Sequence, residues 1–484
     1  MRAVVIGAGL GGLGAALRLQ RAGWDVTVVE RRERPGGRAY QIKDQGFTWD
    51  TGPSLITMPW VLEETFAAGG LDLHSEVTLR PLDPFYRIFW DGEERHFDFS
   101  RDHDRMVAEV AKFSPEDAAQ FDPFMAALKP IYERGILVAG RRPFLRARDL
   151  ARFTPTMVRL GAHLPLARFV ARYFEHPRVR EAFSFHSLFI GGDPYRVPAI
   201  YGALVYLQYL DGAWYTDGGT YSLVEAMARP LDLRCGERVE RIETTAGDRV
   251  TGVRLEGGDV LPADVVVSNA DVLSTHELLG RPAPRRRLTP TMSAFLLFLG
   301  TDRPFPKLLH HTLLVGQGYR DFITKVTRGT QLPSTLSSYL HVPTRTEPGM
   351  GADGGDSLYA LLPVPNLRAR IDWAEAGDEL RERLLATYEG TFGLTGLRAS
   401  IRVEHRMTPE DFRTELGAVD GNAFAVEPTL HQSAYFRQPN RDARVSGLYH
   451  VGGGTHPGAG IPGVLLGAEV TTRLIVEDHA RLAA

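Results

Sequence analysis

The sequence predicts an α/β fold in which a parallel sheet is built from both ends of the chain and a mixed α+β domain is inserted between them. The chain begins with an apolar run followed by closely spaced glycines, and it ends with a second apolar run followed by a glycine-rich loop. Both patterns are typical of a buried strand that turns sharply into a helix. The length of 484 residues also exceeds what one simple core usually contains, so two domains are expected.

The composition is that of an ordinary folded protein, and it argues against several classes of function. Hydrophobic residues make up 43% of the chain and the net charge is −3, so neither disorder nor nucleic-acid binding is expected. The single cysteine, Cys235, excludes an internal disulfide, a redox cysteine pair and a cysteine-ligated cluster. No H-E-x-x-H motif occurs, and no metal site is expected. No apolar run approaches the roughly 18 residues of a membrane span, so we expect a cytoplasmic protein, peripheral to the membrane if it meets one.

The first glycine-rich unit has the spacing of a dinucleotide-binding turn. A strand is predicted over 4–6 and a helix over 10–20, with Gly7, Gly9 and Gly12 between them in G-x-G-x-x-G spacing. The first glycine permits a tight turn, the second lets the backbone approach a diphosphate, and the third lets the helix pack closely on the strand. The N-terminus of the helix offers free N–H groups to phosphate, as in Rossmann-type folds.

An acidic residue and a second glycine pair follow this unit. The next predicted strand ends in Glu30, close to the roughly 20 residues after the glycines at which a carboxylate contacts ribose hydroxyls. The segment "ERPGGRAY" then places Gly36 and Gly37 where the chain could pass close to a cofactor, and Arg38 where it could pair with diphosphate oxygens. The alternative for this segment alone is a surface turn with a solvated arginine.

The C-terminal segment repeats the order strand, glycine loop, helix. A strand is predicted over 448–451, and a helix is predicted from Gly463 to about Glu477, with Pro462 where a helix can begin. Between the two ends, 238–269 alternates apolar and polar residues, with turns at 247–248 and 257–258. Its last strand is a continuous apolar run of the buried type, so this segment is expected to return to the first sheet.

Longer sequence motifs are distributed over nearly the whole chain. They are "GAGLGGLGAA" and "PGGRAY" near the start, "GFTWDTGPSLIT" over 46–57, "FSFHSLFIGGDPY" over 183–195, "WYTDGGTYSL" over 214–223 and "GGGTHPGAGIPGV" over 452–464. With these motifs the chain resembles bacterial-type phytoene desaturases and related carotenoid desaturases of the FAD-containing amine oxidase superfamily. The last motif is quite specific for this family, whereas the glycine loops alone would be shared by all its flavin-containing relatives.

The resemblance implies a function as well as a fold. It implies FAD as cofactor, an acyclic carotenoid as substrate, and the removal of two hydrogens per step to form a double bond. It also suggests a membrane lipid surface as partner and a quinone or oxygen as electron acceptor. Within the family, the 1-hydroxycarotenoid 3,4-desaturases are an alternative, because the segment 200–214 looks more like theirs. A flavin amine oxidase, a carotenoid ketolase and a non-catalytic carotenoid carrier are more distant alternatives.

The resemblance also assigns segments and site residues. It implies an FAD-binding domain formed by 1–75, 226–285 and 421–484, with a substrate and membrane-binding domain formed by 76–225 and 286–420. The FAD-binding residues that it implies, together with those of the glycine motifs, are Gly7, Gly9, Gly12, Glu30, Gly36, Gly37, Arg38, Val239, Gly453, Gly454, Thr455, His456, Gly460, Ile461, Pro462, Gly463 and Val464.

Desaturation of an unactivated carbon requires apolar walls more than acid–base groups. Candidate wall residues are Phe183, Phe185, Phe189, Tyr201, Tyr206, Tyr209, Trp214 and Tyr215, although for any one of them taken alone an ordinary core is the favoured interpretation. Asp149 and Arg152 lie three apart on a predicted helix and match a family pair considered for acid–base work; a surface ion pair is the alternative. The segment 141–172 is rich in arginine with interleaved apolar residues, which is typical of a membrane-surface helix or of an internal helix with one solvated face.

Overall fold

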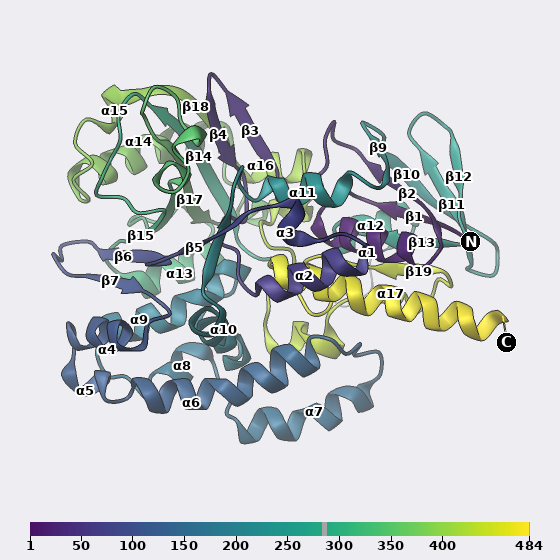
Figure 1. The fold of residues 1–484 in the computed structure, drawn as a ribbon, viewed down its shortest axis with the longest axis horizontal. Helices are drawn as coiled ribbons and strands as arrows, with labels where there is room; N and C mark the ends of the chain where they lie inside the picture. Colours follow the sequence, from purple (N-terminus) through teal and green to yellow (C-terminus); the bar gives the residue numbers. More distant parts are fainter. Residues whose placement is uncertain (283–287, 484) are drawn as a thin grey trace.

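The computed structural model describes residues 1–282 and 288–483, and its first layer is a parallel sheet built from three distant parts of the chain (Figure 1). The sheet has five strands in the order β19-β13-β1-β2-β9, and all of its neighbouring pairs are parallel. The strands are β1 (Arg2–Ile6), β2 (Asp25–Glu30), β9 (Asp232–Cys235), β13 (Val265–Ser268) and β19 (Leu448–His450). The α/β fold and the return of the chain to this sheet are therefore confirmed.

Alternating side chains of β1 explain how the sheet is covered on both faces. Ala3 and Val5 pack into the core beneath the helices α1 (Leu10–Arg21) and α17 (Ile461–Ala483), which lie side by side (Figure 1). Val4 and Ile6 point to the other face and pack against the antiparallel strands β10 (Val239–Thr244), β11 (Val250–Leu255) and β12 (Val260–Pro262). The helix α17 begins two residues before the predicted start, with Pro462 in its first turn.

The inserted region contains a larger sheet of seven strands in the order β18-β14-β17-β16-β15-β6-β7. Its strands are β6 (Tyr86–Trp90), β7 (His96–Phe99), β14 (Ser293–Thr301), β15 (His311–Val315), β16 (Ser338–His341), β17 (Ser357–Val364) and β18 (Ile401–Met407). All pairs are antiparallel except β15 with β6. Two further sheets have two antiparallel strands each: β3 (Gln41–Asp44) with β4 (Phe47–Asp50), and β5 (Leu79–Leu82) with β8 (Ala213–Thr216).

Helices surround the seven-stranded sheet and form a separate layer along the bottom of Figure 1. The bottom layer and its neighbours are α4 (His103–Ala111), α5 (Pro115–Ala118), α6 (Phe121–Tyr132), the π-helix η1 (Glu133–Ala139), α7 (Ala147–Arg159), α8 (Leu166–Val170), α9 (Pro177–Ser184), the 3₁₀ turns η2 (Phe185–Ile190) and η3 (Ala199–Gly202), and α10 (Ala203–Asp211). The remaining α-helices are α2 (Pro59–Ala68), α3 (Leu73–Glu76), α11 (Tyr221–Ala228), α12 (Val272–Leu278), α13 (Tyr319–Arg328), α14 (Trp373–Gly390), α15 (Leu397–Ser400) and α16 (Pro409–Thr414). The residue ranges expected for the domain segments stay predictions.

Candidate functional site

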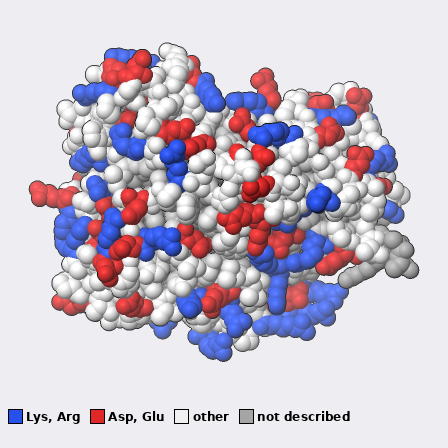
Figure 2. All heavy atoms as spheres, in the orientation of Figure 1, with Lys and Arg blue, Asp and Glu red and all other residues white. Residues whose placement is uncertain are grey.

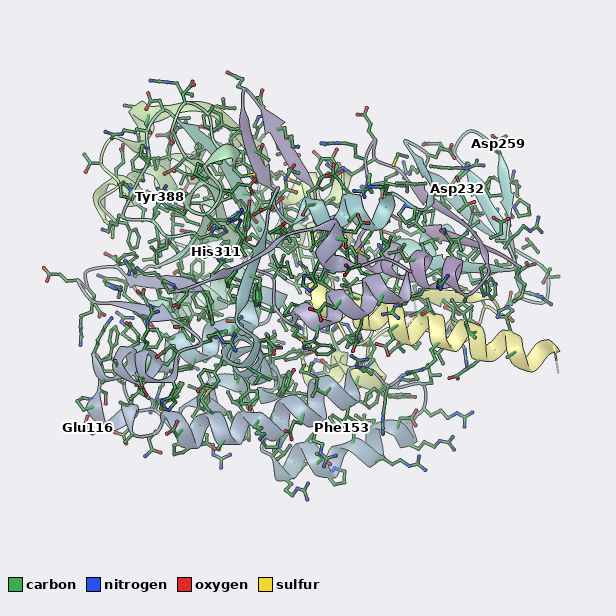
Figure 3. The ribbon with its side chains drawn as sticks, in the orientation of Figure 1. Glu116, Phe153, Asp232, Asp259, His311 and Tyr388 are labelled. Carbon is green, nitrogen blue, oxygen red and sulfur yellow. The ribbon has the colours of Figure 1, made fainter. Side chains whose placement is uncertain are left out.

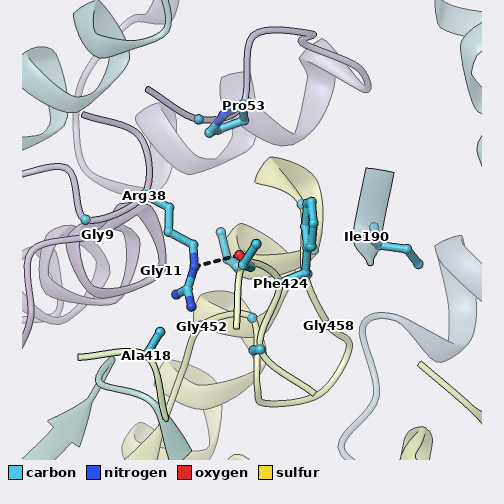
Figure 4. Close-up of a pocket in the computed structure, with 18 of the residues that line it drawn as sticks. Gly9, Gly11, Arg38, Pro53, Ile190, Ala418, Phe424, Gly452 and Gly458 are labelled. Carbon is cyan, nitrogen blue, oxygen red and sulfur yellow. Dashed lines mark hydrogen bonds between the residues drawn. The ribbon is translucent and has the colours of Figure 1, made fainter. Parts of the chain in front are cut away.

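One large cavity extends from the carboxyl end of β1 into the space between the seven-stranded sheet and the bottom helices. Its volume is about 1420 Å³, and its lining combines the two glycine-rich ends of the chain with strands of the larger sheet. Figure 4 draws the meeting point, where Gly9, Gly11 and Arg38 face Gly452 and Gly458. The two chain ends therefore contribute to one site, as the sequence predicts.

The first turn is shaped by glycines that leave no space for a side chain. Gly7 adopts φ +94°, and its N–H donates to the carbonyl of Val29 at 2.8 Å. A Cβ at Gly9 would lie 2.9 Å from Nδ2 of Asn269, and one at Gly12 would lie 2.1 Å from the carbonyl oxygen of Gly7. Gly7 and Gly9 line the cavity, whereas Gly12 lies outside its lining and permits the close packing of α1 on the turn.

Glu30 and Val239 lie at the end of the cavity beyond the β1–α1 turn. The Glu30 carboxylate is buried and accepts hydrogen bonds from the N–H of Ala8 at 2.8 Å and of Arg32 at 3.0 Å. These bonds fix the carboxylate at the carboxyl end of β2, on the cavity wall. Such a carboxylate suits ribose hydroxyls and opposes a 2′-phosphate.

Arg38 projects into the site from the second glycine pair, and its guanidinium is partly engaged by the protein. Nε donates to the carbonyl of Ala423 at 2.8 Å, a bond drawn in Figure 4, and Nη2 donates to the side-chain oxygen of Asn422 at 3.1 Å. Burial lowers the pKa of Arg38, although the carboxylate of Asp271 opposes this shift. The structure thus assigns part of this arginine to bracing the 422–423 loop, which the sequence did not indicate.

The C-terminal loop contributes the opposite wall, and Gly453, His456 and 460–464 all belong to the cavity lining. Gly454 and Thr455 lie outside that lining; a Cβ at Gly454 would lie 2.7 Å from the Val272 side chain, so this glycine serves packing. His456 Nε2 donates to the carbonyl of Ala139 in η1 at 3.1 Å. Burial lowers the pKa of His456 to about 4, so its ring is neutral at pH 7.

The far end of the cavity is mostly apolar. Among the predicted wall residues, Phe185, Phe189 and Tyr201 line it, whereas Phe183, Tyr206, Tyr209, Trp214 and Tyr215 do not. The other walls come from helices, strands and loops whose lining residues sequence analysis did not identify: Leu188, Ile190, Leu204, Leu207, Met292, Ala294, Leu296, Leu313, Val315, Tyr339, Tyr359, Leu361 and Phe424. Apolar residues of this kind have no local sequence signature that separates a cavity wall from a core.

A small polar network is embedded in this apolar end. The Tyr86 hydroxyl lies 2.8 Å from Oε1 of Gln208 and 2.6 Å from Nε2 of His186, and Gln208 also lines the cavity. Burial lowers the pKa of His186 to about 3, so this ring is neutral as well. The network therefore presents an uncharged amide to whatever occupies the apolar end.

Asp149 and Arg152 lie on α7, outside the cavity lining. The Asp149 carboxylate caps the start of the helix, where it accepts from the N–H of Arg146 at 2.9 Å. Among the described residues, Asp149 and Arg152 form no ion pair with each other, in contrast to the surface pair that the alternative interpretation expected. Their acid–base role stays a prediction.

The geometry fits a flavin dinucleotide. Gly9 and Gly36 lie side by side in a β-bridge, and without side chains they leave the N-terminus of α1, with its positive dipole end, open to the cavity. The first turn of α1 contains no carboxylate that would repel a diphosphate. The guanidinium of Arg437 also lines the cavity, and its Nε is buried without a partner among the described residues. Such a group is suited to an anionic or hydrogen-bond-accepting ligand.

Comparisons with known proteins agree with this geometry. The model of the family described as "Flavin containing amine oxidoreductase" matches residues 10–475. The chain is 40% identical to a phytoene desaturase (lycopene-forming) of Pseudescherichia vulneris, over 99% of both chains, and 41% identical to one of Pantoea ananas, over 98% of this chain and 99% of that protein. A crystal structure of an oxidoreductase from Methanosarcina mazei superposes with a TM-score of 0.63 at 18% identity, covering 99% of this chain and 100% of the other.

Proposed function

The chain belongs to the flavin-containing amine oxidoreductase family, and on that premise we propose that it is an FAD-dependent carotenoid desaturase of carotenoid biosynthesis. The observation that carries the proposal is the continuity of the cavity. Its glycine-lined end fits a dinucleotide, and a flavin held as a dinucleotide is FAD; its other end is walled by aliphatic and aromatic side chains. A long polyene is a ligand that such an apolar end would bind.

The chain's own residues contribute orientation and exclusion of water. When bound, FAD supplies a two-electron acceptor for hydrogen removed from a C–H bond. Phe185, Phe189 and Leu313 provide apolar surface that keeps water from the reacting carbon. The N-terminus of α17, at Ile461, directs its positive dipole end toward the cavity and favours negative charge that develops there on reduction.

The substrate of this proposal is an acyclic carotenoid such as phytoene, with a quinone or oxygen as the final electron acceptor. The 3,4-desaturation of a 1-hydroxycarotenoid is the second candidate, and the Gln208 amide favours it because it could hydrogen-bond a substrate hydroxyl in the apolar end. A substrate that is insoluble in water must be taken from lipid, which supports attachment to a membrane surface.

The helix α7 supports such attachment. None of its residues is buried, and Val158 is 54% exposed. Figure 2 shows basic side chains gathered over α7, at the bottom of the view. Arg142, Arg146, Arg148, Arg152 and Arg159 are exposed and, within the described chain, form no ion pair. Among the described helices none is long and apolar enough to span a bilayer. From the exposed basic and apolar side chains of α7 we propose that this helix faces the lipid headgroups and that the protein attaches to a membrane surface.

The test uses the FAD-loaded enzyme in liposomes with phytoene or a 1-hydroxycarotenoid, with a quinone or oxygen as acceptor, and with or without NADPH. We expect a longer conjugated system, seen as absorption at longer wavelength, with no requirement for NADPH. The preferred substrate distinguishes the two candidates. A strict NADPH requirement, or an oxygenated product without a new double bond, would favour a ketolase or monooxygenase instead.

A further inference from the structure

Three buried histidines form a cluster in the seven-stranded sheet, outside the cavity lining. His311 begins β15 and is the cross-strand partner of His341, the last residue of β16, while His310 immediately precedes β15. Figure 3 labels His311 within this domain. The exposed fractions of His310, His311 and His341 are 5%, 0% and 0%. One ring nitrogen of each lies within 4.8 Å of the other two.

Hydrogen bonds on the outer side of the cluster orient two of the rings. His311 Nδ1 donates to the carbonyl of Phe85 at 3.1 Å, so its proton lies on Nδ1 and its Nε2 holds a lone pair. That Nε2 is buried and has no hydrogen-bond partner among the described residues. His310 Nδ1 lies 2.6 Å from the hydroxyl of Thr346, which leaves its Nε2 facing the cluster. Metal-binding histidines are held in this way, by a bond from the ring nitrogen that does not bind the ion.

The third ring, that of His341, cannot satisfy both of its nitrogens within the described chain. Nδ1 of His341 also lacks a partner within the described chain, so either neutral tautomer of this ring leaves a buried nitrogen unsatisfied.

The distance between two of the nitrogens is close to that of a metal site. Nε2 of His310 and Nε2 of His341 are 3.1 Å apart. Two nitrogens bound to one zinc ion at about 2.0–2.1 Å in tetrahedral geometry would be roughly 3.3 Å apart. The Tyr215 ring packs 4.7 Å from His310, and the Tyr215 hydroxyl donates to the carboxylate of Glu347 at 2.7 Å.

We propose that His310, His311 and His341 bind one divalent first-row transition-metal ion through Nε2, with zinc the best fit. Three imidazole ligands suit zinc and its neighbours better than calcium or magnesium, which prefer oxygen. Water would complete the coordination. The ion would tie the ends of β15 and β16 together, and the same strands supply Leu313 and Tyr339 to the apolar cavity wall. Its role is to hold that wall, independently of the proposed reaction.

The test requires full-length, FAD-loaded protein purified without a polyhistidine tag. Cells are grown in zinc-limited medium supplemented with cobalt, so that the ion enters during folding and exchange into a buried site is not needed. The measurements are metal content per chain, visible absorption of bound Co²⁺, and the thermal midpoint before and after metal removal with a chelator. The variants are His311→Gln and His341→Gln, and the control is His74→Gln, whose side chain is 63% exposed.

We expect about one Co²⁺ per chain, with the strong visible bands of a tetrahedral ion, and a lower thermal midpoint after its removal. The bound Co²⁺ and its visible bands should be lost in His311→Gln and His341→Gln and kept in His74→Gln. If a variant does not fold, the metal content and the Co²⁺ absorption of the wild-type protein test the proposal. Wild-type protein without bound cobalt or zinc, or cobalt bands that persist in a folded His311→Gln, would overturn the proposal in favour of a neutral hydrogen-bonded cluster.

Discussion

The substitution Gly12→Ala tests how the first glycine turn forms the cofactor site. A Cβ at this position would lie 2.1 Å from the carbonyl oxygen of Gly7 and 3.2 Å from Cβ of Asn269. Because the nearest atom belongs to the backbone, α1 must move by about 1 Å or more to restore ordinary contact distances. The same shift moves the N-terminal N–H groups of α1 away from a bound diphosphate.

Two free energies follow from this shift. Overpacking should lower the free energy of unfolding by about 1–3 kcal/mol. The higher helix propensity of alanine should raise it by about 1 kcal/mol and so offset part of this loss. The loss of one charge-assisted hydrogen bond to the diphosphate is worth roughly 1.5–3 kcal/mol, so the Kd for FAD should rise at least about tenfold. The binding effect is therefore the more sensitive measurement.

The assay compares Gly12→Ala with Gly390→Ala at the end of α14, whose added Cβ would lie within 4 Å of no atom beyond its chain neighbours and the backbone of its own helix. FAD affinity is measured by quenching of flavin fluorescence, and stability by denaturant unfolding of the FAD-free protein. Gly390→Ala should bind FAD like the wild type and be at least as stable. Wild-type FAD affinity in Gly12→Ala would refute the reasoning, because the clash would then have been absorbed without moving the turn.

Three further predictions concern other parts of the molecule. Glu30→Arg should abolish FAD binding. The buried Glu30 carboxylate accepts hydrogen bonds from two backbone N–H groups, and the substitution puts a cation in its place. An unchanged flavin absorption spectrum of the purified variant would contradict this prediction. Replacement of the exposed arginines Arg142, Arg148 and Arg159 by glutamate should weaken liposome flotation at low salt. Flotation equal to that of the wild type would show that these arginines do not contribute to lipid binding. Burial raises the pKa of Asp50 to about 6, so the folded state retains a proton that the unfolded state releases near pH 4, and the free energy of unfolding should fall by about 2 kcal/mol as pH rises from 4 to 6. Asp50→Asn should remove this decline from the pH series of unfolding midpoints, and parallel curves for the two proteins would disprove it.

The parts of the fold that sequence could predict are those with local patterns. The glycine turn at Gly7, the acid at Glu30 and the loop before α17 each combine a periodicity with residues that few other conformations require. The apolar end of the cavity has no such pattern: Leu313, Tyr339 and Phe424 come from separate elements, and only the register of the seven-stranded sheet brings them together. The partial engagement of Arg38 by Asn422 was equally unpredictable, because the two residues are far apart in the chain.

The same long-range assembly determines when the protein can acquire its cofactor during synthesis. The β1–α1 turn is translated long before β19, at the edge of the parallel sheet, and before α17, which packs against α1. Until those segments emerge, β13 has an open edge and the nucleotide has only one of its two walls. Nascent chains that lack β19 and α17 are therefore apoproteins with an unpaired strand edge, which is prone to aggregation, and flavin can be bound only after these two segments have been made.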